Sequence, residues 1–217
     1  MHRSTITRAV REIRPLLAGR GHATPAGPRL HTLADVFAYA AAHGVTLRAD
    51  GSEIQVRRPQ AGRPGRRAFG LGEEEEDEHD HVHQDQRWAG RTLGDGAFGP
   101  GRRHDQTARH TEGIDALLEQ RPHIRCEMDS GYQGLRRDHP GQVSVPPGKP
   151  ATDAPPEATA AGQRARHAQS SQRICVEHAI AGSTHWRPLQ RWTGRRDDLP
   201  ETIQAIGSLV SDQAATW

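Results

Sequence analysis

The sequence predicts an α/β fold, in which helices pack around a small sheet. Two short runs are typical of strands: 45–56 alternates apolar and polar residues, and 124–129 is a brief apolar run stopped by Ser-Gly. Five segments carry apolar residues at helical spacing, at 3–17, 33–42, 104–120, 163–181 and 200–212. The length of 217 residues is enough for one domain of moderate size with a small appendage.

The composition favours a weak core and a polyanionic partner. Hydrophobic residues make up 33% and aromatic residues 4%, both low for a globular protein. The net charge of +2 hides an asymmetry, because 73–85 is almost entirely acidic or His while most other segments are rich in Arg. Lys149 is the only lysine, so arginine supplies nearly all the positive charge. Clusters of Arg are typical of proteins that bind nucleic acid.

The cysteine content and the hydropathy place limits on the cellular compartment. Cys126 and Cys175 are too few for a disulfide framework or a zinc site, so we expect two small, reduced, buried side chains of a cytoplasmic protein. The sequence has no signal peptide and no apolar run near the ~18 residues that a membrane span needs. Neither export nor a membrane partner is therefore expected.

The segment 3–17 is predicted to be an amphipathic helix with Ser4 as its N-cap. Its apolar stripe consists of Ile6, Val10, Ile13 and Leu17. Its other faces carry short hydroxyls and guanidinium groups, namely Arg3, Thr5, Thr7, Arg8 and Arg11. Such side chains suit phosphate and base contacts, as on the second helix of a helix-turn-helix. In that case we expect the first half of the motif to be missing; the alternative is an ordinary surface helix.

Asp50 lies within the first predicted strand, just before a glycine that indicates a bulge or bend at 51–52. Arg57 and Arg58 follow this strand, and a basic, glycine-rich segment comes next at 62–67. A carboxylate is thus followed closely by groups that attract phosphate. The alternative is a solvent-facing Asp at a bend.

The segment 73–95 has neither a helical nor a strand period. A block of like charge normally indicates a solvated loop, which is what we expect here. His79, His81 and His83 alternate within it and offer a second hypothesis, a His-rich and acid-rich metal-binding segment.

Two further acidic residues complete a pattern with Asp50. Asp129 ends the second predicted strand, and Glu177 lies on the helix 163–181, for which Ser170 or Ser171 is the expected N-cap. Two strand aspartates and a helical glutamate suit two-metal phosphoryl transfer, because carboxylate oxygens hold Mg²⁺ or Mn²⁺ and leave positions for water and phosphate.

Four motifs carry a family resemblance, and they occur in the order DGSEIQVRRP at 50–59, HDQTA at 104–108, DSGYQGL at 129–135 and SSQRICVEHAIA at 170–181. Together they resemble the DDE transposases of IS5-like insertion-sequence type. The resemblance implies an RNase H-like catalytic core, a mixed sheet flanked by helices, over 30–212. It also implies that 1–20 is a remnant of a helix-turn-helix DNA-binding domain.

The resemblance further implies the chemistry and the partners. Asp50, Asp129 and Glu177 would form the catalytic triad and hold Mg²⁺ or Mn²⁺. The reaction would be strand cleavage at element ends, followed by attack of the freed 3′-hydroxyl on target DNA. Double-stranded DNA would be the partner, with a homo-oligomer assembled on paired ends of a nucleoid-associated bacterial protein. Arg57 and Arg58 would lie near the DNA backbone, and Arg173 would share the face of Glu177 or simply form a salt bridge with it.

One departure from the family affects the sheet. In the family the segment after the basic loop is rich in Lys and then forms two strands, whereas here it is acidic. A run of GAA codons read one base later becomes AAG, which encodes Lys, so we hypothesise that 72–95 is translated out of frame. We then expect an incomplete sheet, in which Asp50 and Asp129 are poorly held, and a degraded, inactive enzyme.

Three alternatives to an active transposase stay open from the sequence. One is a non-catalytic remnant with nonspecific affinity for DNA through its Arg clusters. Another is an RNase H-like nuclease that does not transpose. The last is the metal-binding protein built on the His-rich and acid-rich segment.

Overall fold

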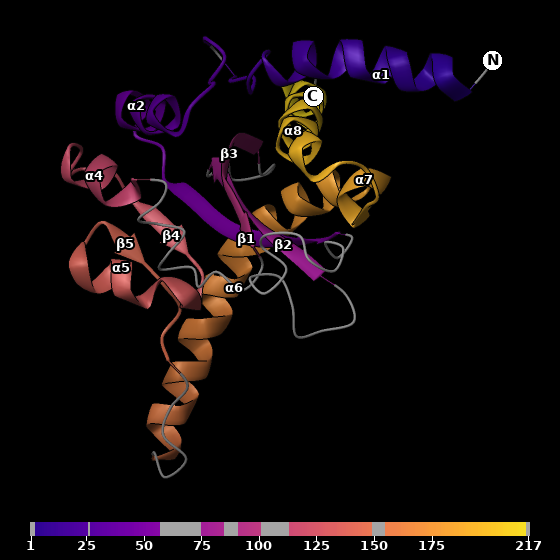
Figure 1. The fold of residues 1–217 in the computed structure, drawn as a ribbon. Helices are drawn as coiled ribbons and strands as arrows, with labels where there is room; N and C mark the ends of the chain where they lie inside the picture. The colour runs from indigo at the N-terminus through magenta and orange to yellow at the C-terminus, as the bar shows by residue number, and fades with distance from the viewer. Residues whose placement is uncertain are drawn as a thin grey trace.

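The computed structural model describes residues 3–25, 27–56, 75–84, 91–100, 113–148 and 155–215. They form a mixed α/β fold in which helices surround one sheet (Figure 1). The strands are β1 (Leu47–Val56), β2 (Glu75–Gln84), β3 (Arg91–Pro100), β4 (Cys126–Met128), β5 (Val143–Ser144) and β6 (Arg191–Trp192). The α-helices are α1 (Arg3–Ala18), α2 (Leu33–His43), α4 (Ile114–Glu119), α5 (Gln133–Asp138), α6 (Pro156–Thr184), α7 (Arg187–Gln190) and α8 (Leu199–Ala215).

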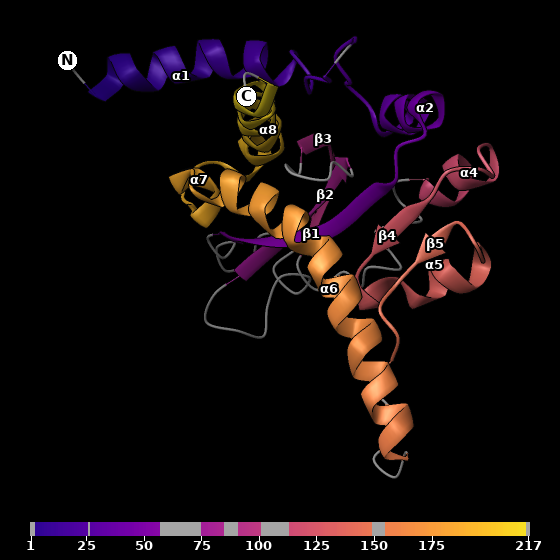
Figure 2. The ribbon, with the colours of Figure 1, turned by 180° about the vertical axis from the view of Figure 1, so that it is seen from behind.

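The sheet has the strand order β3-β2-β1-β4-β5, and β6 pairs with the end of β1. β2 pairs antiparallel with β1 and with β3, whereas β4 and β6 pair in parallel with β1, and β5 pairs in parallel with β4. The long helix α6 crosses β1, and its N-terminal half extends away from the sheet (Figure 2). The predicted α/β class is therefore confirmed.

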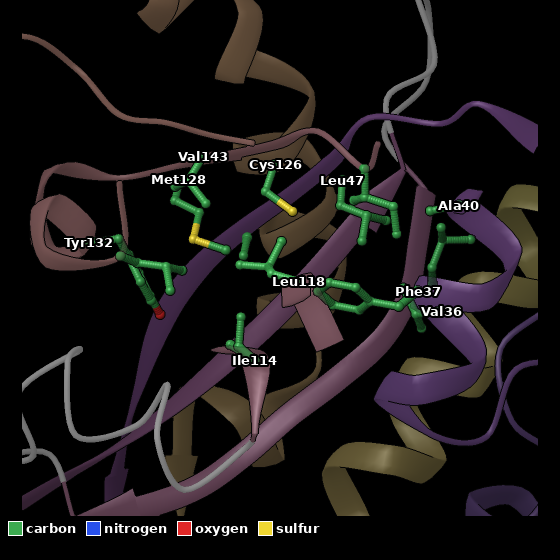
Figure 3. Packing of buried hydrophobic residues seen from close by; sticks show 14 of the residues in the cluster. Val36, Phe37, Ala40, Leu47, Ile114, Leu118, Cys126, Met128, Tyr132 and Val143 are labelled. Carbon is green, nitrogen blue, oxygen red and sulfur yellow. The ribbon is translucent and has the colours of Figure 1, made fainter. Parts of the chain in front are cut away.

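Two hydrophobic clusters hold the layers together. The larger joins α2, α4 and α5 to β1, β3, β4 and β5, and Leu93, Leu118 and Leu135 are fully buried in it (Figure 3). The smaller packs Ile54 and Val56 of β1 against α7 and α8. Low hydrophobic content thus still supplies two cores, because among the described residues outside α1 only Ile174 is an exposed large apolar side chain.

Helix α2 is set by local sequence. The Thr32 hydroxyl accepts a hydrogen bond from the backbone N–H of Asp35, and the Asp35 carboxylate accepts from the backbone N–H of Thr32, which makes a reciprocal capping box. Gly44 ends the helix at φ 62°, in the left-handed region that favours glycine. The helical segment predicted at 33–42 is confirmed.

Helices α1 and α8 also follow the prediction, and they pack against each other. Helix α1 begins at Arg3, so Ser4 is inside the helix and the predicted N-cap is wrong. Arg14 fastens α1 to the start of α8, because its Nε donates to Oε2 of Glu201 at 2.6 Å and its Nη2 lies 3.2 Å from Oδ1 of Asp198. Ile6, Val10 and Ile13 remain about half exposed.

The segment 73–95 is the main correction to the sequence analysis. Residues 75–84 form strand β2, which pairs with the whole length of β1, and 91–95 lie in β3. The expectations of a loop and of an incomplete sheet are wrong for these residues. The reason is long-range: pairing with β1 supplies the order that the charged sequence does not indicate, and Thr92 and Leu93 are buried. The out-of-frame hypothesis concerns the coding DNA and stays a prediction.

Two smaller expectations are also wrong. No bulge interrupts β1, since Gly51 and Ser52 pair in continuous register with β2. Helix α6 begins at Pro156, well before Ser170 and Ser171, because an Ala-rich stretch continues the helix and proline suits its first turn. The inward positions of α6 are Val176, Ala179 and Ser183, whereas Ile174 is 47% exposed.

Two further expectations concern the state of the cysteines and a membrane span. Neither Cys126 nor Cys175 forms a disulfide; Cys126 is buried, whereas Cys175 is only partly buried. Burial raises the pKa of the Cys126 thiol to about 12. In the part of the chain that the structure describes, no helix has the length and apolar character needed to cross a bilayer.

Candidate functional site

Asp50 and Asp129 follow the paired part of two neighbouring strands. β1 and β4 run parallel, with Arg48 paired to Glu127 and Ala49 to Met128. Asp50 is the next residue of β1, and Asp129 comes directly after the end of β4. Neighbouring strands lie about 4.8 Å apart. The expectation that these aspartates are poorly held relative to each other stays a prediction.

The Asp129 side chain is oriented by the turn that follows β4. Its Oδ1 accepts a hydrogen bond from the backbone N–H of Gly131 at 2.8 Å, which caps the short 3₁₀ helix Ser130–Tyr132. Tyr132 is 2% exposed and anchors the turn in the larger core. The DSGY sequence thus both ends the strand and sets the direction of the carboxylate.

Strand alternation assigns the two aspartates to one face of the sheet. Arg48 and Asp50 are two residues apart on β1, as Glu127 and Asp129 are on β4, so all four are on the same face. Arg48 reaches Cys175 of α6, which identifies this face as the one that α6 covers. The opposite face carries Leu47, Ala49, Cys126 and Met128 of the larger core (Figure 3).

Glu177 lies on α6, the helix in which it is expected, but not on the buried face of that helix. Helix α6 packs against β1, with Val176 and Ala179 turned inward, while Glu177 is exposed. Within the described ranges no three His, Cys, Asp or Glu side chains gather closely enough to hold a metal ion. The structure brings together two of the three predicted carboxylates. Their donor chemistry fits a hard cation such as Mg²⁺ or Mn²⁺, because adjacent carboxylates supply oxygen ligands and repel each other without an ion.

The predicted DNA-binding residues fall into three groups. Thr5, Thr7, Arg8 and Arg11 are exposed on α1, and Arg3 is its first residue. This helix lies beside α8, away from β4 and β5 in both views (Figures 1 and 2). Arg173 lies in α6, four positions before Glu177. Arg57, Arg58 and the motif at 104–108 lie outside the described residues.

Sequence reasoning missed a polar network next to the aspartates. Nε of Arg48 donates to Oε2 of Glu127 at 2.7 Å, and Nη1 of Arg48 donates to Sγ of Cys175 at 3.3 Å. The Arg48 side chain is only 6% exposed. An alternating strand predicts a solvent-facing Arg at this position, so the only usable signal was that a buried Arg needs an acidic partner.

Two hollows in the structure lie apart from the aspartates. An apolar groove of about 510 Å³ between α1, α7 and α8 is lined by side chains such as Ile6, Trp186 and Ile206, with no carboxylate among them. A smaller, polar one of about 190 Å³ is lined by His22 and Asp95. The first lacks the groups that hydrolytic chemistry needs, and neither includes Asp50 or Asp129.

Comparison of the chain with family models, with curated proteins and with solved structures finds no match.

Proposed function

We propose that this chain is a DDE-type transposase, a DNA endonuclease and strand transferase that works with divalent metal ions. The observation that carries the proposal is that Asp50 and Asp129 come directly after Ala49 and Met128, the last paired residues of the parallel strands β1 and β4. Glu177 comes from α6, which packs against the same β1 strand. The three residues of the sequence triad thus lie on β1, directly after β4 and on α6, and β1 contacts both of the other elements.

The arrangement of strands supports the proposal independently of the acidic residues. The resemblance implies a mixed sheet flanked by helices. The described sheet is mixed, with the order β3-β2-β1-β4-β5, antiparallel pairing of β2 with β1 and β3, and parallel pairing of β4 with β1 and β5. It also puts the first Asp on β1 and the second directly after β4, which agrees with the motif resemblance found in the sequence.

The side chains have separable roles in this reaction. Asp50 and Asp129 would hold the ions between them, and the Gly131 N–H keeps the Asp129 carboxylate in one direction. Glu177, which is exposed on α6, would supply the third carboxylate. When bound, the ions activate the attacking hydroxyl and stabilise the leaving oxygen.

Helix α1 supports the proposed DNA partner. Arg8 and Arg11 are exposed on it, together with the hydroxyls of Thr5 and Thr7. Guanidinium groups bind phosphate oxygens strongly, and short hydroxyls add neutral hydrogen bonds. We therefore assign α1 to contacts with the DNA backbone.

The test is a cleavage and strand-transfer assay with the purified chain, Mg²⁺ or Mn²⁺, and a duplex that carries the ends of the encoding element. We expect metal-dependent nicking, joined product, and loss of both in Asp50→Ala and Asp129→Ala. Asp197→Ala is the matched control, since its side chain is 84% exposed and lies far along the chain in the 3₁₀ turn before α8. Nicking without joined product would instead indicate a nuclease that does not transpose.

A second candidate is a non-catalytic remnant that retains DNA affinity. The exposed position of Glu177, and the lack of a three-carboxylate group among the described residues, favour it. This candidate predicts salt-sensitive DNA binding without cleavage at any metal concentration. The same assay, run beside a binding measurement, separates the two.

A further inference from the structure

We propose that Arg48 is the positioning residue of the Asp50, Asp129 and Glu177 site, because it ties together the three elements that carry them. The proposal rests on the proposed function for the role of these carboxylates. Arg48 itself lies on β1, its Nε donates to Glu127 on β4, and its Nη1 donates to Cys175 on α6. One side chain therefore bridges all three elements.

Each anchor point lies two residues before a member of the triad. Arg48 precedes Asp50, Glu127 precedes Asp129, and Cys175 precedes Glu177. On a strand, residues two apart share a face, so fixing Arg48 and Glu127 fixes the relative height of the two aspartates. On a helix, two residues lie about 3 Å apart along the axis and about 200° apart around it, so Cys175 and Glu177 are on different faces of α6, and holding Cys175 sets the height of Glu177 through the helix backbone.

The bridge formed by Arg48 matters because strand β4 is short. Strand β4 has only three residues, and its parallel pairing with β1 covers only those three. A pairing of only three residues does little to keep the ends of β1 and β4 together. Two adjacent carboxylates also push these strand ends apart when no cation lies between them. The Arg48–Glu127 ion pair crosses from β1 to β4 immediately before the aspartates and opposes that movement.

Burial keeps the contact between Arg48 and Glu127 in a defined geometry. The Arg48 side chain is 6% exposed and that of Glu127 19% exposed, so the pair is shielded from water and its 2.7 Å contact is well defined. A guanidinium group has several donors in one plane, and it can hold a carboxylate and a thiol at once. A lysine has one compact charge and cannot reproduce this fork.

The experiment compares the full chain with Arg48→Met, Arg48→Lys and a matched control, Arg14→Met. Arg14 is also largely buried, at 13% exposed, and also paired with two acidic groups, but it joins α1 to α8 instead. Two quantities are measured: the affinity for Mn²⁺, by electron paramagnetic resonance of the free ion, and the hydrogen-exchange protection of the Gly131 amide in metal-free protein. That amide donates to Asp129 and so reports directly on the position of the carboxylate.

We expect Arg48→Met to weaken Mn²⁺ binding about 10- to 100-fold, the range for loss of a group that orients metal ligands. Gly131 should also lose protection, while Arg48→Lys restores part of both and Arg14→Met changes neither. Equal values in the full chain, Arg48→Met and Arg14→Met would overturn the proposal. If the unaltered chain binds no Mn²⁺, the proposed function fails, and Gly131 protection still decides whether Arg48 positions Asp129.

Discussion

His22 and Asp95 form a buried pair that joins the N-terminal segment to strand β3. Nε2 of His22 lies 3.5 Å from Oδ2 of Asp95, and the two side chains are 7% and 4% exposed. Asp95 ends the stretch whose composition indicates a loop, yet it lies in the interior against helix α8. The pair therefore reports on whether β3 belongs to the folded protein.

The change Asp95→Ala removes the carboxylate that faces the buried His22 imidazole. We expect it to lower the free energy of unfolding by about 1–3 kcal/mol, the cost of depriving a buried polar group of a partner. Urea unfolding measures this difference. The control Asp197→Ala alters a side chain that is 84% exposed and should stay within about 0.5 kcal/mol. An Asp95→Ala protein as stable as the control would mean that β3 does not pack as described.

Gly207 and Gly182 form a natural pair for testing the same region. A Cβ at Gly207 in α8 would lie 2.8 Å from Oδ2 of Asp95 and 2.9 Å from Nε2 of His22, closer than real Cβ atoms approach such groups. A Cβ at Gly182 in α6 would meet Cγ1 of Val210 at 3.6 Å, an ordinary van der Waals distance.

The two Gly→Ala changes should therefore shift the midpoint of thermal unfolding in opposite directions. Gly207→Ala should destabilise by about 1–3 kcal/mol through overpacking. Gly182→Ala should stabilise by up to about 1 kcal/mol, because alanine favours a helix over glycine. Stabilisation by both changes would contradict the packing of His22 and Asp95 against α8.

The capping box of α2 predicts a dependence on pH. The hydrogen bond from the His31 backbone, helped by bonds from Thr32, lowers the pKa of the Asp35 carboxyl below its ordinary 3.8. A carboxyl whose pKa is lower in the folded state stabilises it fully above the unfolded pKa. That contribution is lost as the pH falls through the folded pKa, which here lies below 3.8.

We expect Asp35→Ala to cost up to about 1 kcal/mol of unfolding free energy at pH 7 and clearly less near pH 3. Thr32→Ala is the matched control, because it removes the other half of the box and its hydroxyl does not titrate in this range. Denaturant unfolding at both pH values measures the two differences. A loss for Asp35→Ala that does not change with pH would show that the charge has no part in the cap.

The sequence predicted those elements whose determinants are local. Thr32, Asp35 and Gly44 set both ends of α2 within a dozen positions, so a sequence pattern suffices there. Strand β2 could not be predicted, because its order comes from pairing with β1 rather than from its own acidic residues. Arg48 was missed for a similar reason, since alternation alone does not reveal that α6 covers its face of the sheet.

The coding DNA tests the origin of the acidic strand. Reading codons 70–102 in all three frames should reveal, in a neighbouring frame, a Lys run followed by an alternating strand. Strand β2 would then be an altered version of a family strand that still pairs with β1. If no frame encodes such a run, the acidic residues are an original feature of this protein.

The Arg residues of α1 predict how DNA affinity changes with salt. Binding to each phosphate releases condensed counterions, so the slope of log K against log salt concentration becomes shallower by about 0.9 for each phosphate that the protein no longer neutralises. Arg8→Ala and Arg11→Ala should each reduce the slope by about this amount and weaken binding similarly for all sequences. Fluorescence anisotropy with a labelled duplex, titrated at several salt concentrations, measures the slope.

Arg137→Ala is the control for this series. Its side chain is 81% exposed on α5, so it removes an equal charge from a surface that the proposal does not assign to DNA. Unchanged slopes for Arg8→Ala and Arg11→Ala would remove α1 from the DNA interface. An equal reduction of the slope in Arg8→Ala, Arg11→Ala and Arg137→Ala would mean that DNA affinity depends only on the total charge of the protein. In that case a long-range field, to which exposed charges anywhere on the surface contribute alike, would attract the DNA.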